Sequence, residues 1–453
     1  MKKQFTIALL FVAMISQAQL QPLQVSANKR YFQTKDGKPF FWLGDTGWLL
    51  FVKCTREDAI KYLDDRKAKG FNVVQVMVVH DINLGVNVYG DSALHNKDVS
   101  KPNTTPGSSF GNNAEYDFWD HADYIIDEAA KRGIYMALVP VWGSNIKYVT
   151  EEQAKKYAAF LASRYANKSN IIWLNGGDVK GSEGMKQWKM IGTTIRAIDK
   201  QHLMTYHPRG RHSSSAWFHN EPWLDFNMFQ SGHRRYDQDT LSNEKLHYGE
   251  DNWRYVKTDY ALKPVKPTFD GEPSYENIPQ GLHDFAEKRW AAADIRRYAY
   301  WQTFAGGCGF TYGNNSVMQF FRNGDKDMNY GANVNWDEEL NAPAAGQMKF
   351  LKELMLDRSY FDRVPDQSLV MDNGEKYNRI LATRGKNYAM FYIYNGRACT
   401  VAMGKLGFEP AKATWLNPAD NRMIPIKSFN KENTFTPPGE KRDGNDWVLI
   451  LEK

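Results

Sequence analysis

The sequence predicts an α/β fold in which an eight-stranded (β/α)8 TIM barrel precedes a small antiparallel β-sandwich. Its 453 residues suit one large and one small domain. Eight short apolar runs alternate with amphipathic helical stretches, the pattern of βα units around a parallel sheet. After about residue 365 this alternation gives way to short strands and turns, which indicates a compact β domain. No Gly-rich nucleotide-binding turn follows the first run, so an open doubly wound sheet is disfavoured.

The predicted barrel strands are nearly continuous hydrophobic runs, as expected for strands that are buried on both faces. They cover residues 40–44, 71–79, 134–141, 171–175, 203–207, 225–230, 266–271 and 308–312.

The helices between these strands are predicted from apolar spacing and capping residues. The expected ranges are 55–69, 115–132, 151–166, 186–200, 291–303 and 345–356. Thr150 and Gln153 have the spacing of a capping box at the start of the third helix. The stretches after strands five and six are irregular and rich in aromatic residues. In the second domain, we expect strands at 388–394, 400–403, 413–416 and 447–451, with a turn at Asn395-Gly396.

Residues 1–18 have the sequence pattern of a signal peptide. Lys2 and Lys3 precede an apolar stretch over residues 5–15, and Ser16-Gln17-Ala18 supplies small residues for cleavage. We therefore expect an exported protein, periplasmic or extracellular, whose barrel domain covers residues 25–362 and whose β domain covers residues 366–453. No later segment has the length and apolarity of a membrane span.

Charge and cysteine content exclude several classes of protein. The formal charge of +6 becomes +4 without residues 1–18, and no run of basic and aromatic residues suggests nucleic-acid binding. Cys54, Cys308 and Cys399 are too far apart in sequence for a paired metal-binding motif. The sequence does not define an oligomeric state.

Two acidic residues follow strands that should face each other across the barrel mouth. Asp178 ends an Asn-Gly-Gly-Asp stretch after strand four, and Glu272 follows strand seven. Active sites of such barrels lie at the C-terminal strand ends. Hydrolysis of a glycosidic bond needs two carboxyl groups, one to protonate the leaving oxygen and one to attack or to activate water. A separation of roughly 5 Å predicts retention of configuration, and more than about 6.5 Å predicts inversion. The alternative is a pair of ordinary loop acids that cap helices.

Further polar and aromatic residues at the same strand ends are predicted to bind substrate. Aromatic rings in this position either stack on a sugar or fill the barrel mouth. The histidines either hydrogen-bond sugar hydroxyls or play a structural part. The predicted binding residues are Asp45, Trp48, His80, Trp142, Asn175, His207, Arg209, Gln230 and Tyr312.

A barrel metallohydrolase is one rival interpretation, because His207, His233 and Asp270 also end strands. Such enzymes usually carry a closely spaced His pair at strand one, where this chain has Asp45 and Trp48. We therefore predict no metal and no cofactor. A second rival is a non-catalytic barrel that binds carbohydrate, which the presence of both carboxylates disfavours.

Five short motifs together match a known family of barrel and β domains. They are Trp42-Leu43-Gly44-Asp45-Thr46, Ile172-Trp173-Leu174-Asn175-Gly176-Gly177-Asp178, Phe269-Asp270-Gly271-Glu272-Pro273-Ser274-Tyr275-Glu276, Gly309-Phe310-Thr311-Tyr312-Gly313 and Trp415-Leu416-Asn417-Pro418.

On the first four motifs, residues 25–360 resemble the apiosidase-like catalytic domain of glycoside hydrolase family 140. The resemblance implies a retaining mechanism with Asp178 as acid/base and Glu272 as nucleophile, and activity on apiose in the plant pectin rhamnogalacturonan II. The remainder resembles a collagen-binding-type β domain that often follows this barrel, with Asn417 where Asp is common.

Overall fold

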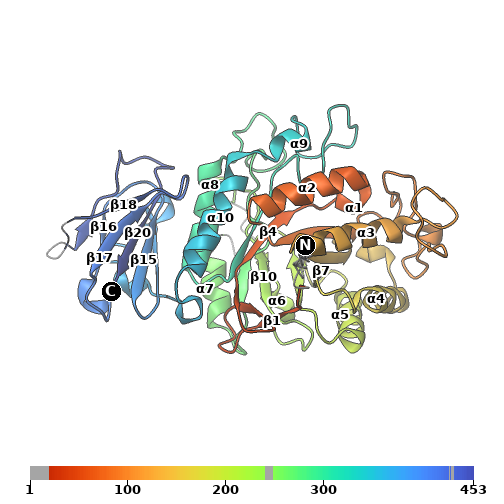
Figure 1. Cartoon of the computed structure of the whole chain (residues 1–453), viewed down its shortest axis with the longest axis horizontal. Coiled ribbons are helices and arrows are strands. Elements are labelled where there is room, and N and C mark those ends of the chain that lie inside the picture. Colours follow the sequence, from red (N-terminus) through yellow and green to blue (C-terminus); the bar gives the residue numbers. More distant parts are fainter. Residues whose placement is uncertain (1–19, 240–247, 428, 430–432) are drawn as a thin grey trace, which may run out of the picture.

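The structure is a computed structural model that describes residues 20–239, 248–427, 429 and 433–453. The predicted signal peptide lies outside the described residues. Figure 1 shows two parts, a helix-wrapped barrel and a blue β domain beside helices α8 and α10. Within the described ranges, no helix has the length and apolar character needed to cross a membrane.

Eight parallel strands form the barrel, which confirms the predicted fold class. Six of them make one sheet in the order β12-β4-β5-β6-β7-β8. The remaining two, β10 and β11, pair in parallel and lie beside β8 and β12, so the ring closes. Each strand starts and ends within a few residues of its predicted range. The eight are β4 (Trp42–Thr46), β5 (Val73–Val79), β6 (Tyr135–Val141), β7 (Ile171–Val179), β8 (Met204–Pro208), β10 (Asn227–Gln230), β11 (Thr268–Asp270) and β12 (Gly309–Tyr312).

Helices cover the outside of the barrel close to the predicted positions. In the stretches after strands five and six, predicted to be irregular, the described residues form the short strand β9 (His212–Ser213) and the short helices α6 and α7. The helices are α1 (Leu50–Lys53), α2 (Arg56–Ala68), α3 (Phe118–Lys131), α4 (Glu151–Tyr165), α5 (Met185–Ile198), α6 (Ser215–Phe218), α7 (Trp253–Ala261), α8 (Ala292–Phe304), α9 (Trp336–Glu339) and α10 (Pro343–Leu356).

Capping side chains set the starts of three of these helices, α2, α3 and α4, and Thr55 caps α2 by accepting from the backbone N–H of Asp58. Thr150 and Gln153 form the predicted capping box of α4. Asp117 caps α3 by accepting from the backbone N–H of Trp119 and Asp120. Helix α3 therefore begins at Phe118, slightly later than predicted, because a capping residue has extended backbone and lies outside the helix.

A small antiparallel sheet covers the N-terminal end of the barrel. It contains β1 (Leu23–Val25), β2 (Phe32–Thr34) and β3 (Pro39–Phe40). The Phe32 ring lies 5.0 Å from that of Phe226 and 6.2 Å from that of Phe269, which close this end with aromatic packing. The opposite end, where the strands terminate, stays open.

The C-terminal part is an antiparallel β domain with its own core, as predicted. Its main sheet has the order β13-β14-β15-β20-β17-β18, and β16 pairs with β19. A separate apolar cluster that includes Phe391, Trp415 and Leu449 fills its interior. The strands are β13 (Val364–Pro365), β14 (Ile380–Arg384), β15 (Tyr388–Ile393), β16 (Cys399–Thr400), β17 (Lys412–Leu416), β18 (Met423–Pro425), β19 (Thr434–Phe435) and β20 (Trp447–Glu452).

Strand β15 joins the two parts because its two faces pack on different cores. Phe391 and its alternate neighbours belong to the core of the β domain. Tyr392 belongs to the barrel core and stacks on Tyr300 of α8, with ring centroids 4.8 Å apart. Because each face of β15 packs on a core, every residue of this strand is buried.

Buried ion pairs reinforce this junction. Arg296 of α8 binds both oxygens of Asp446, at 2.9 and 2.7 Å. Arg297 lies 2.6 Å from Glu250, and both side chains are fully buried. The hydroxyl of Tyr377, from the β domain, donates to Glu250 at 2.8 Å. Charges buried without solvent are tolerated only when they are paired, so these contacts hold the β domain against the barrel.

Candidate active site

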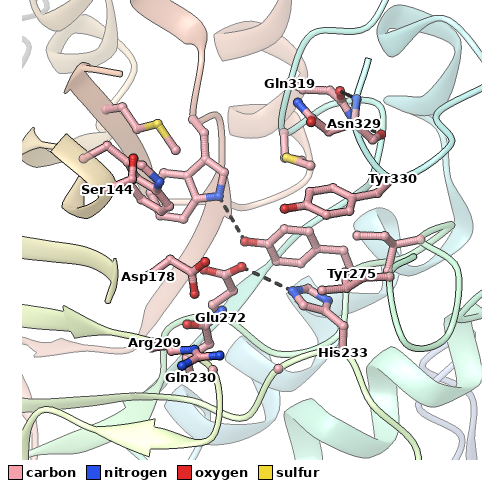
Figure 2. Close-up of a pocket in the computed structure, with 18 of the residues that line it drawn as sticks. Ser144, Asp178, Arg209, Gln230, His233, Glu272, Tyr275, Gln319, Asn329 and Tyr330 are labelled. Carbon is pink, nitrogen blue, oxygen red and sulfur yellow. Dashed lines mark hydrogen bonds and ion pairs between the residues drawn. The ribbon is translucent and has the colours of Figure 1, made fainter. Parts of the chain in front are cut away.

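A cavity of about 490 Å³ opens where the barrel strands end. Its wall includes both predicted catalytic carboxylates, Asp178 and Glu272. Figure 2 shows the two carboxyl groups turned toward the same space, with Arg209 and Gln230 nearby. The barrel topology thus brings together two acids that are 94 positions apart in the sequence.

An irregular turn at the end of β7 presents Asp178 to the cavity. The pairing of β7 with β8 shifts register between Gly176 and Val179, as in a β-bulge. Gly176 and Gly177 have φ values of +95° and +115°, and Asp178 itself has a φ of +52°. A Cβ on Gly176 would lie 2.6 Å from the carbonyl oxygen of His207, so only glycine fits there. Bulges commonly re-aim a side chain next to an active site, and this one directs Asp178 into the cavity.

Two histidines flank the carboxylate of Glu272. His233 Nε2 lies 3.2 Å from Glu272 Oε1, within hydrogen-bond distance. His207 Nε2 lies 3.2 Å from Glu272 Oε2, within ion-pair distance. All three side chains are buried. The carboxylate is thereby fixed in orientation and stabilised in its ionised form.

The surroundings push the pKa values of the two acids in opposite directions. Burial raises the pKa of Asp178, and the negative charge of Glu272 raises it further, to about 6. Burial also opposes ionisation of Glu272, but its contacts with His207 and His233 outweigh that effect and lower its pKa to about 2. Near pH 5 the site therefore holds one protonated and one ionised carboxyl group, an arrangement suited to acid–base work.

An aromatic wall stands beside the carboxylates. Trp48 and Trp142 line the cavity with ring centroids 5.3 Å apart. The indole N–H of Trp48 donates to the hydroxyl of Tyr275 at 3.1 Å, a bond visible in Figure 2. Tyr330 lines the same cavity from another loop. Such rings provide flat apolar surfaces with polar edges, which suit sugar rings.

A family model described as "Apiosidase-like, catalytic domain" matches residues 26–362, most of the chain. The chain belongs to this apiosidase-like family. A second model, "Putative collagen-binding domain of a collagenase", matches residues 364–452.

Solved structures of glycoside hydrolases are similar to the chain over nearly its whole length. A protein described as "Glycoside hydrolase" shares 44% identity with a TM-score of 0.88, over 96% of this chain and 97% of that chain. A glycoside hydrolase family 5 protein from Bacteroides vulgatus shares 42% identity with a TM-score of 0.89, over 95% and 92%. No curated protein matches the sequence. The apiosidase-like chain is therefore a glycoside hydrolase.

Besides Glu272, six of the predicted catalytic and binding residues of the apiosidase-like chain line the cavity. They come from the ends of different strands and from the loops that follow them. These residues are Trp48, His80, Trp142, Asp178, Arg209 and Gln230. His207, predicted to bind substrate, is fully buried and instead contacts Glu272.

Three other predicted binding residues of the apiosidase-like chain point away from the cavity, which corrects those assignments. Asp45 is fully buried, where it accepts from Tyr62 at 2.7 Å and pairs with Arg66 at 3.3 Å. Asn175 donates to the Trp188 carbonyl oxygen at 2.8 Å. Tyr312 donates to Glu276 at 2.7 Å. Each of these side chains has a hydrogen-bond partner inside the protein, because alternate residues of a strand face the outer helices and loops rather than the barrel mouth.

Sequence reasoning missed the role of two residues of the apiosidase-like site. The sequence suggests a metal ligand or a sugar contact for His233, but this side chain contacts Glu272. No sequence pattern predicts a role for Tyr275, although it lies three positions after Glu272 in the Asp-Gly-Glu-Pro-Ser-Tyr-Glu stretch. That proximity is the signal that could have identified it.

The residues weighed as zinc ligands are engaged elsewhere. His207 and His233 contact Glu272. Asp270 accepts from the hydroxyl of Ser231 at 2.6 Å and from Asn252 at 3.0 Å. Among the residues that the structure describes, no group of three His, Cys, Asp or Glu side chains has the arrangement of a metal site.

Proposed function

We propose that the chain is a retaining apiosidase that acts on the pectic glycan rhamnogalacturonan II. The observation that carries the mechanism is the placement of two carboxyl groups in one cavity, with Glu272 alone flanked by two histidines. These surroundings shift the two pKa values apart, to about 6 for Asp178 and to about 2 for Glu272. A general acid must hold a proton at working pH, whereas a nucleophile must be ionised.

In the first step, Asp178 donates its proton to the glycosidic oxygen while Glu272 attacks the anomeric carbon. The carbon–oxygen bond to the leaving group breaks as the bond to Glu272 forms, giving a covalent glycosyl-enzyme. Departure of the leaving alcohol removes the proton from Asp178. The nucleophile becomes a neutral ester, so its charge no longer repels a charge on Asp178.

In the second step, Asp178 acts as a base. It takes a proton from water, whose oxygen attacks the same anomeric carbon and displaces Glu272. The sugar leaves with its original configuration, Glu272 is again a carboxylate and Asp178 again holds a proton. The change in the partner's charge supports this exchange of roles, because Glu272 raises the pKa of Asp178 only while it is ionised.

Neighbouring side chains position the nucleophile and the sugar. His207 and His233 hold the two oxygens of Glu272. Tyr275, fixed by Trp48, lies next to that carboxylate. Trp48 and Trp142 offer a stacking surface, and His80, Arg209 and Gln230 supply polar groups for hydroxyls at the cavity wall.

The apiosidase-like family supports apiose as the released sugar. A pectic glycan as the substrate follows from the family resemblance of the sequence motifs. We also propose export to the periplasm or beyond the cell, on the signal-peptide pattern of residues 1–18. A plant-wall polysaccharide is encountered outside the cytoplasm, so the two proposals agree.

The test is incubation with rhamnogalacturonan II fragments, followed by mass analysis of the products. The wild-type protein should release a pentose, and Asp178→Ala and Glu272→Ala should each lower the rate by several orders of magnitude. Asp443→Ala, at an exposed acid in the β domain, is the matched control and should remain active. Wild-type activity in both active-site variants would disprove the assignment, and binding without release would favour a non-catalytic carbohydrate-binding barrel.

A further inference from the structure

Backbone contacts hold His233 from the side away from the nucleophile. Its carbonyl oxygen accepts from the indole N–H of Trp290 at 3.2 Å and from the backbone N–H of Gly281 at 2.8 Å. Its side chain points to Glu272, with Nε2 3.2 Å from Oε1 (Figure 2). The orientation of the Glu272 carboxylate therefore depends on what holds the backbone of residues 231–236, which we call the His233 loop.

A buried acid outside the cavity wall anchors the end of the His233 loop. Glu250 is fully buried, is not among the described residues that line the cavity, and accepts from the backbone N–H of Tyr236 at 3.4 Å. Its carboxylate also pairs with Arg297 of α8 at 2.6 Å. The hydroxyl of Tyr377 donates to the same carboxylate and lies 2.8 and 3.0 Å from its two oxygens. A buried carboxylate is stable only with its partners in place, so these three contacts depend on one another.

Tyr377 is the partner of Glu250 that the β domain supplies. It lies in a short 3-10 helix, Lys376–Asn378. Its ring centroid is 5.7 Å from that of Tyr236 and 4.8 Å from the guanidinium carbon of Arg297. One side chain of the β domain thus contacts the buried carboxylate, the arginine that neutralises it and the end of the His233 loop.

The strand that leads to the nucleophile is tied to the same region. Asn252 donates to Asp270, two residues before the nucleophile, at 3.0 Å and to the carbonyl oxygen of Tyr298 at 2.9 Å. The ring of Tyr298 packs on Trp290, with centroids 5.9 Å apart, and Trp290 in turn donates to the carbonyl oxygen of His233. Both sides of the contact between histidine and nucleophile therefore connect to the part of the barrel on which the β domain packs.

We propose that Tyr377 of the β domain is a positioning residue for the reaction. By donating to Glu250 it holds the His233 loop in place, and His233 holds the Glu272 carboxylate in the orientation for attack. The β domain then contributes to the rate of the reaction without touching the substrate. This inference rests on the proposed function, because it takes Glu272 as the nucleophile.

Tyr377→Phe tests this role, because it removes only the hydroxyl and keeps the ring against Tyr236 and Arg297. On rhamnogalacturonan II fragments, kcat should fall by about two- to tenfold, which corresponds to the net contribution of one hydrogen bond. KM should stay unchanged, because Tyr377 is not among the described residues that line the cavity.

Tyr388→Phe is the matched control at the same junction. Tyr388 is a buried residue of β15, and its hydroxyl donates to the carbonyl oxygen of Ser359 at 3.3 Å. Loss of this hydroxyl should also lower the free energy of unfolding, but it should leave kcat and KM at their wild-type values. The comparison separates positioning of the nucleophile from general stabilisation of the fold.

NMR of protein labelled at the histidine ring nitrogens gives a second readout that needs no substrate. The signals of His233 are identified by their absence in His233→Gln. In Tyr377→Phe these signals should shift, because the imidazole moves relative to Glu272. In Tyr388→Phe they should keep their wild-type positions.

A wild-type kcat in Tyr377→Phe, or unshifted His233 signals in that variant, would overturn the positioning role while the proposed catalytic function stood. Failure of the wild-type protein to cleave the fragments would count against the proposed function. The His233 signals would still decide whether Tyr377 positions the histidine.

Discussion

His233 Nε2 lies 3.2 Å from Oε1 of Glu272, on the opposite side of the carboxylate from His207. This contact links the end of β10 to the loop after β11, so two neighbouring strands determine the orientation of the nucleophile. It also has an energetic consequence, because contacts with both histidines overcome burial and lower the pKa of Glu272 to about 2.

Replacement of His233 should therefore move the acid limb of the pH–rate profile. In His233→Ala, Glu272 loses a partner that favours its ionised form, so its pKa rises above 2 and activity falls at a higher pH than in the wild type. The measurement is kcat/KM between pH 2 and 7. His233→Gln keeps a donor and should recover part of the shift. An unchanged acid limb in His233→Ala would contradict this role.

Activity should decline above pH 6 in the wild-type protein. Asp178 has a pKa of about 6 and must be protonated to act as an acid, so its active fraction falls about tenfold per pH unit above that value. The acid limb should appear near pH 2, where Glu272 becomes protonated. The profile is measured as kcat/KM, which reports the free enzyme. Constant activity up to pH 8 would exclude Asp178 as the titrating acid.

Removal of the charge on Glu272 should lower the pKa of Asp178. The ionised carboxylate of Glu272 is the second-largest cause of the raised value, after burial. In Glu272→Gln that repulsion disappears, so the pKa of Asp178 falls below 6. NMR titration of a carboxyl-labelled aspartate measures it directly in the inactive variant. A pKa that remained at the wild-type value would mean that the two acids do not interact.

The glycine turn before Asp178 should tolerate no side chain. Gly176→Ala combines a φ of +95° with a Cβ 2.6 Å from a backbone oxygen, so stability should fall by more than about 1 kcal/mol and activity should drop with it. Gly133→Ala is the control, because Gly133 has a φ of +76° but open space around its Cβ. It should cost about 1 kcal/mol and leave kcat unchanged. Urea denaturation and kcat measure the two effects. Equal losses of activity in both variants would argue against a specific role for the turn.

The buried pair of Arg297 and Glu250, which lies in the barrel where the β domain packs on it, should stabilise the protein. Arg297→Met leaves Glu250 as a buried, uncompensated charge, which should cost about 3–5 kcal/mol. The double variant Arg297→Met with Glu250→Gln should recover part of that loss, because it removes both charges. Arg254→Met, at a half-exposed arginine, should change stability by less than about 0.5 kcal/mol. Denaturant midpoints that did not separate Arg297→Met from this control would show that the buried ion pair does not contribute to stability.

The sequence predicted the barrel because its strands are continuous apolar runs and its helices carry capping residues such as Thr150. It predicted Asp178 and Glu272 because the C-terminal ends of parallel strands all face one end of a barrel. Both predictions depend on position along the chain rather than on side-chain direction.

Predictions that needed side-chain direction were less successful. On β4, Trp42 points into the barrel and donates to Thr311 at 3.0 Å, so Asp45, an odd number of positions later, points outward to Tyr62 of α2. Strands that are apolar on both faces conceal this alternation, because no polar face marks the outside. Tyr275 was missed for a different reason, since it lies in a loop whose path no periodicity predicts.

The most direct test of the central claim is to trap the covalent intermediate. Asp178→Ala, supplied with an apioside that carries an activated leaving group, needs no acid for the first step but lacks the base for the second. Intact mass and peptide mapping should then show one sugar attached to Glu272. Turnover without any adduct, with release of a sugar of inverted configuration, or an adduct on another residue would contradict the mechanism.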